Sequence, residues 1–146
     1  MRRIGWAAVA VATVAVLASG TRIFGADDDD RGCSFRTLRG QYLFAANGFN
    51  IIGGVAQPKA IVEVIDFNGD GTLSVPAATR SINGVIGQIP PGGVGDYTVE
   101  AGCTGTIAFT GGPSFDLFLA PGARTAWMIQ TNPNTVFQGT ATRLSR

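Results

Sequence analysis

The stretch DFNGDGTLS, which begins at Asp66, has the residue types of a calcium-binding loop. Asp66, Asn68 and Asp70 stand at positions 1, 3 and 5 of such a loop, and Gly71 stands at position 6. Position 12 should supply a bidentate Glu, but here it is Ala77, and a β-branched run precedes the stretch instead of a helix. Asn-Gly and Asp-Gly pairs also suit tight hairpin turns. We therefore predict a turn without metal, and calcium ligation by Asp66, Asn68 and Asp70 stays the alternative.

The remaining composition excludes several common catalytic arrangements. The chain contains no His, so a Ser-His-Asp triad, a Cys–His pair and a His-ligated metal are all excluded. Neither a Gly-x-Ser-x-Gly motif nor a Gly-rich phosphate loop before a helix is present. We assign no catalytic residue and no cofactor, and carboxylates are the remaining candidates for acid–base chemistry.

Glu63 is the carboxylate that the sequence marks most clearly as a candidate for a ligand-binding or acid–base site. Strand alternation places it on one face with Ile61, Ile65 and Phe67. If that face lines the protein interior, the pKa of Glu63 should rise unless the carboxylate is paired. In the alternative, which the sequence alone leads us to favour, Val62 and its neighbour Val64 face inward and Glu63 lies on the wet face.

Five further residues complete the candidate ligand-binding set. Three are aromatic side chains that could form an amphipathic pocket wall, although core packing is the reading we favour for each. Two are polar side chains on strands that otherwise read as apolar. The set is Tyr42, Glu63, Tyr97, Asp116, Trp127 and Gln130. Arg143, in the last strand, is a candidate partner for either carboxylate.

The elements that position these residues read as strands from Arg39 onward. Gly, Pro and Asn interrupt almost every window long enough for a helix, while Thr, Val, Ile and Phe favour short strands. We expect strands at 40–47, 51–56, 59–67, 79–88, 95–100, 103–110, 114–120, 124–131 and 134–143, with 51–56 the weakest. Their even spacing predicts an all-β fold, a single small antiparallel barrel of about eight strands, with a β-sandwich as the alternative.

The N-terminus reads as a secretory signal peptide. Basic residues at positions 2 and 3 precede an apolar run of 14 residues, and Ala18-Ser19-Gly20 fits a cleavage site. The run is short for a membrane span, which needs roughly 20 residues, so an uncleaved anchor is the lesser alternative. We expect a signal peptide over 1–20, with cleavage as late as 26, a disordered acidic leader over 21–32, and the barrel over 33–146. Residues 27–30 are four aspartates, for which cation binding is the weaker reading.

Charge and cysteine content agree with export. Removing the signal peptide leaves nine basic side chains against ten acidic ones, with no basic patch for nucleic acid. The two cysteines, Cys33 and Cys103, predict one disulfide in an oxidising compartment, with two free thiols as the alternative. We expect a periplasmic or extracellular protein without a stable membrane span after cleavage, and its oligomeric state stays open.

The order of short motifs resembles a group of small exported bacterial proteins of unknown function. The motifs are Cys33, Leu38-Arg-Gly40, Tyr42-x-Phe44, Phe67-Asn-Gly-Asp-Gly71, Gly95-Asp-Tyr-Thr-Val99, Cys103-Thr-Gly-Thr106, Ile129-Gln-Thr131 and Gly139-Thr-Ala-Thr-Arg143. The resemblance covers about 33–143 and implies a barrel similar to the calycin or allene-oxide-cyclase type. It implies no activity, and residues 76–94 are longer than its pattern needs.

Together these features predict a secreted, non-enzymatic barrel. We expect it to bind a small apolar or amphipathic ligand or to act as an envelope interaction module. The alternative is a cyclase- or isomerase-like barrel enzyme that uses a buried carboxylate, and a third reading is a structural surface protein with no pocket.

Overall fold

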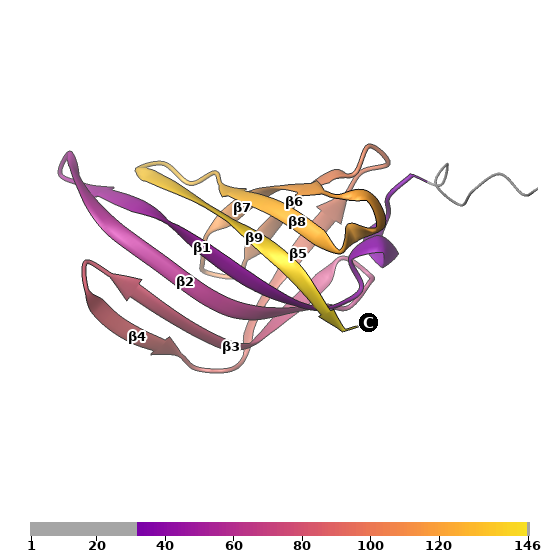
Figure 1. Ribbon diagram of the computed structural model, residues 1–146, viewed down its shortest axis with the longest axis horizontal. Coiled ribbons are helices and arrows are strands. Elements are labelled where there is room, and N and C mark those ends of the chain that lie inside the picture. The colour runs from indigo at the N-terminus through magenta and orange to yellow at the C-terminus, as the bar shows by residue number, and fades with distance from the viewer. Residues whose placement is uncertain (1–31, 146) are drawn as a thin grey trace, which may run out of the picture.

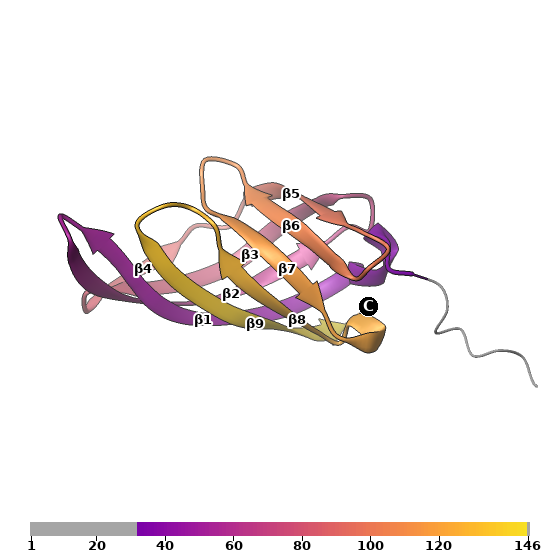
Figure 2. The ribbon, with the colours of Figure 1, turned by 90° about the horizontal axis from the view of Figure 1, so that it is seen from above.

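The computed structural model describes residues 32–145, which form one closed antiparallel barrel with an extra strand (Figures 1 and 2). The predicted signal peptide and nearly all of the acidic leader fall on residues 1–31, outside the described part. The strands are β1 (Gly40–Ile52), β2 (Val55–Phe67), β3 (Thr72–Ile82), β4 (Val85–Ile89), β5 (Gly93–Val99), β6 (Thr104–Phe109), β7 (Ser114–Leu119), β8 (Thr125–Gln130) and β9 (Thr135–Ser145). Two 3-10 helices, η2 (Phe35–Leu38) and η3 (Pro121–Ala123), lie at one end of the barrel.

The pairing of β2 with β3 closes the barrel. The sheet runs β2-β1-β9-β8-β7-β6-β5-β3, and β2 also pairs with β3, which joins the two edges. All pairs are antiparallel. The barrel prediction is therefore confirmed, and the β-sandwich alternative is wrong, because the edges of this sheet hydrogen-bond to each other.

The region between 72 and 89 differs from its prediction. We expected a single strand over 79–88, but β3 and β4 form a hairpin that turns at Asn83 and Gly84, whose φ angles of 50° and 81° are those of a tight hairpin turn. β3 pairs with β5 through Thr72–Val75 and with β4 farther along the same edge. The extra hairpin accounts for the length of residues 76–94. Pro76 lies in β3 at an irregularity of the β2–β3 register, a place where a strand tolerates proline.

The weak candidate strand over 51–56 was also wrong. These residues form the tip of the β1–β2 hairpin, where Gly53 and Gly54 both have positive φ angles, 59° and 79°. The two strands that meet there are long, and in Figure 1 the β1–β2 and β3–β4 hairpins reach far to the left of the barrel.

The interior is filled with aromatic and aliphatic side chains in one cluster, and four rings pack at the end near η2 and η3. Tyr42, Phe67, Tyr97 and Phe35 form a chain of edge-to-face ring contacts with centroids 5.0–5.7 Å apart, a favourable geometry for aromatic pairs. The largest fully buried side chains are Tyr42, Phe44, Phe67, Leu38, Ile65, Leu73, Ile107, Leu117 and Met128. This end of the barrel is closed, and we call it the closed end.

A disulfide joins Cys33 to Cys103, so the two cysteines are not free thiols. It connects the segment before η2 to the β5–β6 turn across a sequence separation of 70 residues. The predicted pairing is confirmed, and the bond ties the start of the described chain to the closed end.

Candidate functional site

Glu63 lies inside the barrel, which makes the favoured sequence reading wrong. It is 8% exposed and stands between Phe44 of β1 and Ala78 of β3 in the sheet register. The barrel turns the Ile65 and Phe67 face of β2 inward and leaves Val62 outside. β2 carries β-branched residues on both faces, so its alternation did not identify the inner face.

Among the acidic side chains of the described residues, Glu63 has the most strongly shifted pKa. No hydrogen bond or ion pair reaches its carboxyl group from residues 32–145. Burial raises the pKa of Glu63 from 4.5 to about 7, and the attraction of Lys59 opposes this rise. Near neutral pH the group therefore exists in both protonation states, a property suited to proton exchange or to pairing with a polar ligand.

Lys59 is the residue of this region that sequence analysis missed. It lies on the inner face of β2, four residues before Glu63, and its Nζ donates a 3.0 Å hydrogen bond to Oε1 of Gln130 on β8. The same ammonium lies 4.1 Å from the ring centroid of Phe137 on β9. Burial lowers the pKa of Lys59, the positive charge of Arg80 lowers it further, and Glu63 raises it. The signal was present in the sequence, since residues 59 and 63 share strand parity.

Gln130 is held between two partners. Its Oε1 accepts the bond from Lys59, and its Nε2 donates to Oδ1 of Asn132 over 3.1 Å. The same Asn132 oxygen accepts a 2.7 Å bond from the main-chain N–H of Ser114. These bonds fix the orientation of the Gln130 amide and the position of the Lys59 ammonium group that donates to it.

Glu63, Lys59 and Gln130 mark the end of the barrel opposite η2 and η3. Around them Ile61, Ile89 and Phe109 are partly buried and pack against the core. We call this region the open end. It combines an apolar inner surface with one carboxyl group, one ammonium and one amide.

The two candidate tyrosines belong to the closed end instead. The hydroxyl of Tyr42 donates a 2.6 Å hydrogen bond to the carbonyl oxygen of Ala123 in η3. The hydroxyl of Tyr97 donates to the carbonyl oxygen of Phe35 over 3.0 Å and accepts a 3.1 Å bond from the N–H of Gly69. Their rings belong to the core, as we favoured, and their hydroxyls tie the 3-10 helices and the β2–β3 turn to the barrel.

Asp116 and Trp127 lie on the outer wall. Both side chains are exposed, and their registers place them on neighbouring strands β7 and β8. The six candidate residues therefore do not form one site: two lie at the open end, two at the closed end and two outside. Strand parity determines that Trp127 and Gln130 face opposite sides, but it does not say which side is inside.

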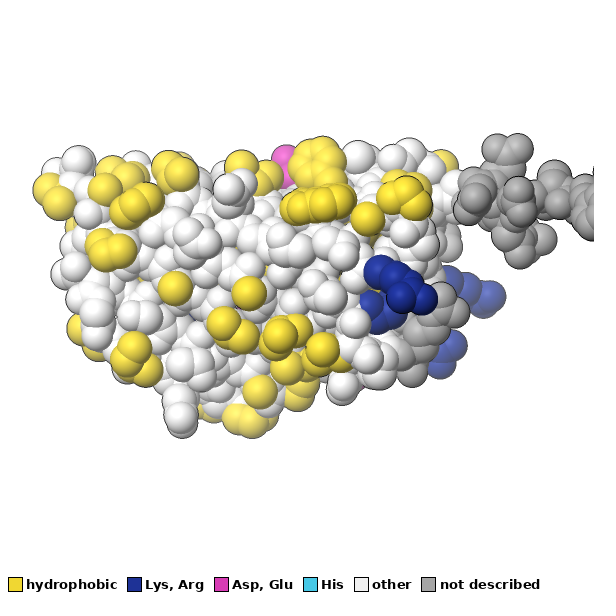
Figure 3. Space-filling model, in the orientation of Figure 1, with side chains coloured by type: hydrophobic (Ala, Val, Ile, Leu, Met, Phe, Trp, Pro, Cys, Tyr) yellow, Lys and Arg dark blue, Asp and Glu magenta, His cyan; other side chains and the backbone are white. Residues whose placement is uncertain are grey.

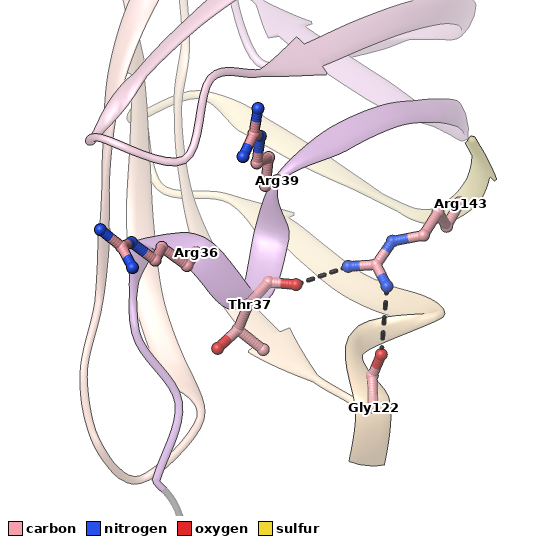
Figure 4. A pocket seen from close by; sticks show the side chains of 5 residues that line it. All are labelled: Arg36, Thr37, Arg39, Gly122 and Arg143. Carbon is pink, nitrogen blue, oxygen red and sulfur yellow. Dashed lines mark hydrogen bonds between the residues drawn. The ribbon is translucent and has the colours of Figure 1, made fainter. Parts of the chain in front are cut away.

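Arginines surround a hollow of about 500 Å³ at the closed end (Figure 4). Arg36, Arg39 and Arg143 line it, and Figure 3 shows basic side chains gathered at the right-hand end of the described chain. Arg143 donates to the carbonyl oxygens of Thr37 and Gly122 and stacks over Tyr42 at 5.1 Å. Arg143 was a candidate partner for Glu63 or Asp116, but its hydrogen bonds go to these carbonyl oxygens instead. Arg143 instead ties both 3-10 helices to β9, which gives it a structural role.

The DFNGDGTLS turn is held by its own side chains. Asp70 Oδ1 accepts bonds from the N–H and the hydroxyl of Thr72 at 3.0 and 2.7 Å, and Asn68 donates to the same hydroxyl. These hydrogen bonds lower the pKa of Asp70. Within the described residues no group of three or more His, Cys, Asp or Glu side chains is placed to hold a metal ion. The turn explains these residues without a metal, and the absence of calcium binding stays a prediction.

No protein-family model, curated protein or solved structure matches this chain. The resemblance to exported bacterial barrel proteins therefore stays a prediction, and the role of the open end rests on its geometry. Among residues 32–145 no helix is long and apolar enough to cross a bilayer.

Proposed function

We propose that the protein is an exported, non-enzymatic barrel that binds a small amphipathic ligand at its open end. The observation that carries this proposal is the buried carboxyl group of Glu63, which has no partner within the described residues and faces a partly covered apolar surface. Burial raises the pKa of this carboxyl group and so disfavours its charged form, and its retention inside a barrel favours a ligand that pairs with it.

The chemistry of the open end indicates what such a ligand carries. Ile61, Ile89 and Phe109 offer apolar surface, while Lys59 offers N–H donors held in place by Gln130. A ligand with an apolar body and a hydrogen-bond-accepting or anionic end would match both parts. The protonated form of Glu63 supplies a further donor, and an eight-stranded barrel is wide enough for one small ligand.

Export is part of the proposal. The disulfide between Cys33 and Cys103 fits an oxidising compartment, and the N-terminal sequence has the charge and apolar pattern of a signal peptide. We place the protein in the periplasm or outside the cell.

A second candidate function is catalysis by proton transfer. Its support is the pKa of about 7 at Glu63, which suits a general acid or base at neutral pH, as an isomerisation or cyclisation requires. Replacement of Glu63 by Gln separates the two functions. In an enzyme the variant binds substrate and loses turnover, whereas a carrier shows no turnover with either protein.

The first test uses 1-anilinonaphthalene-8-sulfonate, a probe with apolar rings and one anionic group. Its fluorescence should rise saturably with the native protein, and Lys59→Met should weaken binding at least tenfold. Arg124→Met is the matched control, because it removes one positive charge from the closed end and should leave binding unchanged. Absent probe binding, or equal binding by the Lys59 variant, would contradict the proposal.

The second test identifies the natural ligand. Native mass spectrometry of the protein purified from its own host should show an added mass that is released on unfolding. Lys59 is the only lysine in the sequence, so ¹³C reductive methylation labels one side chain besides the N-terminus. The resonance of that side chain should shift when the released compound is added back, and an unchanged resonance would place the compound elsewhere.

A further inference from the structure

The outer wall of the barrel carries a groove of about 440 Å³ over strands β8, β9 and β1. The pairing of residues across neighbouring strands explains the shape of the groove. One cross-strand row runs from Phe118 through Trp127 and Thr140 to Ala45, so two large aromatic side chains are followed by two small ones. Phe118 and Trp127 therefore stand higher on the sheet than Thr140 and Ala45, and they form the aromatic wall of the groove.

A second row supplies polar groups along the same groove. Ile129 on β8 is followed by Gln138 on β9 and Asn47 on β1. Neither amide, nor the hydroxyl of Thr140, makes a hydrogen bond to any described residue. Each amide offers both N–H donors and a carbonyl acceptor. Every side chain that lines the groove is uncharged.

The aromatic wall is accessible. Trp127 is 53% exposed and Phe118 is 49% exposed, although aromatic residues of this size are mostly buried in small domains. Figure 3 shows a patch of apolar side chains on the wall over the strands drawn at the top of Figure 1, with an acidic side chain beside it. Asp116 stands next to Ile129 in the register and would repel an anionic ligand.

We propose that this groove binds the ring of a neutral saccharide, stacked on Trp127 and hydrogen-bonded by Asn47 and Gln138. A pyranose ring has an apolar face of C–H groups that suits an indole, and its rim of hydroxyls both donates and accepts hydrogen bonds, as amides do. A hydrocarbon would leave both amides unpaired, and a charged ligand would find no counter-charge among the lining residues. The site is separate from the open end and does not depend on Glu63.

The volume of the groove suits a small ligand. Small-molecule sites have volumes of about 300–1,000 Å³, and the groove falls in this range.

The test uses the intrinsic fluorescence of the site. The sequence has two tryptophans, Trp6 and Trp127, so the full chain with Trp6→Phe reports on Trp127 alone. Cellohexaose, the hexamer of β-1,4-linked N-acetylglucosamine, and maltohexaose are titrated separately to about 10 mM, which covers the weak end of specific binding. We expect at least one to shift the emission of Trp127 saturably.

Variants read by titration calorimetry locate the binding. Trp127→Ala should abolish it, and Asn47→Ala and Gln138→Ala should each weaken it at least tenfold. Ile86→Ala is the matched control, since it removes a large exposed apolar side chain from β4, outside the groove, and should bind as the parent does. Circular dichroism confirms that each variant is folded.

Three results would overturn the proposal. The first is the absence of a response to all three oligosaccharides. The second is binding that survives Trp127→Ala. The third is a concentration-dependent dimer, seen by sedimentation and lost in Trp127→Ala, which would identify the groove as a contact between copies of the chain.

Discussion

Replacing Glu63 by Gln should remove a loss of stability that the native protein undergoes as the pH rises. The pKa of Glu63 is about 7 in the folded state and 4.5 when the group is freely solvated. Between these values the folded chain holds a proton that the unfolded chain has released. The favourable contribution of the protonated group is therefore complete below pH 4.5 and is lost as the pH rises through about 7.

The magnitude follows from the two values. The interval between 4.5 and about 7, at about 1.4 kcal/mol for each pH unit, corresponds to about 3 kcal/mol of unfolding free energy. This conversion is appropriate because Glu63 is 8% exposed. Gln has the shape of the protonated acid and cannot ionise. Any cost of burying its amide is independent of pH, so the decisive quantity is the change with pH in the difference between variant and parent.

The assay is urea unfolding followed by circular dichroism, with the disulfide intact, from about pH 4 to about pH 8.5. Other ionisable groups titrate in both proteins and cancel in the difference. Relative to the parent, Glu63→Gln should gain about 3 kcal/mol between the two ends of this range. Glu100→Gln makes the same chemical change on the exposed β5–β6 turn and should not reproduce that gain.

A difference that stays constant across the pH range would refute the reasoning, because it would mean that Glu63 titrates alike in the folded and unfolded chains. A gain toward low pH would refute it more strongly, since it would require a partner that stabilises the carboxylate. Addition of the ligand of the open end should alter the parent profile and leave the Gln variant less affected.

Four further outcomes are expected. Replacing Cys33 and Cys103 by Ser should lower the unfolding free energy by about 4 kcal/mol in urea titrations, because a 70-residue separation leaves a long loop unclosed in the unfolded chain; a loss below about 1 kcal/mol would contradict this. Tyr42→Phe should cost about 1–2 kcal/mol in the same assay by removing the hydrogen bond to Ala123, and an unchanged midpoint would argue against that bond. Gly139→Ala should cost about 1–3 kcal/mol or prevent folding, because the added Cβ would clash with the main-chain oxygen of Ala45 in β1; a neutral result would show that the strands can separate. Millimolar calcium should leave the thermal midpoint unchanged, and a rise would reopen the metal reading of the β2–β3 turn.

Local patterns predicted most of the strands because their information lies within a few residues. β5 to β9 fall within two residues of their expected bounds, since strong alternation lies between clear turn residues. β3 and β4 were misjudged for an identifiable reason. The Asn83-Gly84 pair, a strong hairpin signal, lies inside the single strand that we expected over 79–88.

The candidate site was predicted less well, because its residues come together only through closure. Lys59 and Gln130 are 71 residues apart in sequence and meet across the interior. No local pattern indicates that pairing. Trp127 was a candidate for a pocket wall with the two tyrosines, and core packing was the favoured reading. It lies on the outer wall instead, while both tyrosines belong to the closed end, so core packing was wrong for Trp127.

The sequence by itself determined that the chain is a β protein with a specific pair of bonded cysteines, since strand parity and the number of thiols are properties of neighbouring residues and of composition. Only the tertiary structure decided which of the two faces of β2 is inside. A strand that is apolar on both sides can be buried on either, and the β2–β3 pairing that closes the barrel selects the face. That choice buries Glu63 and gives it the properties on which the proposed function depends.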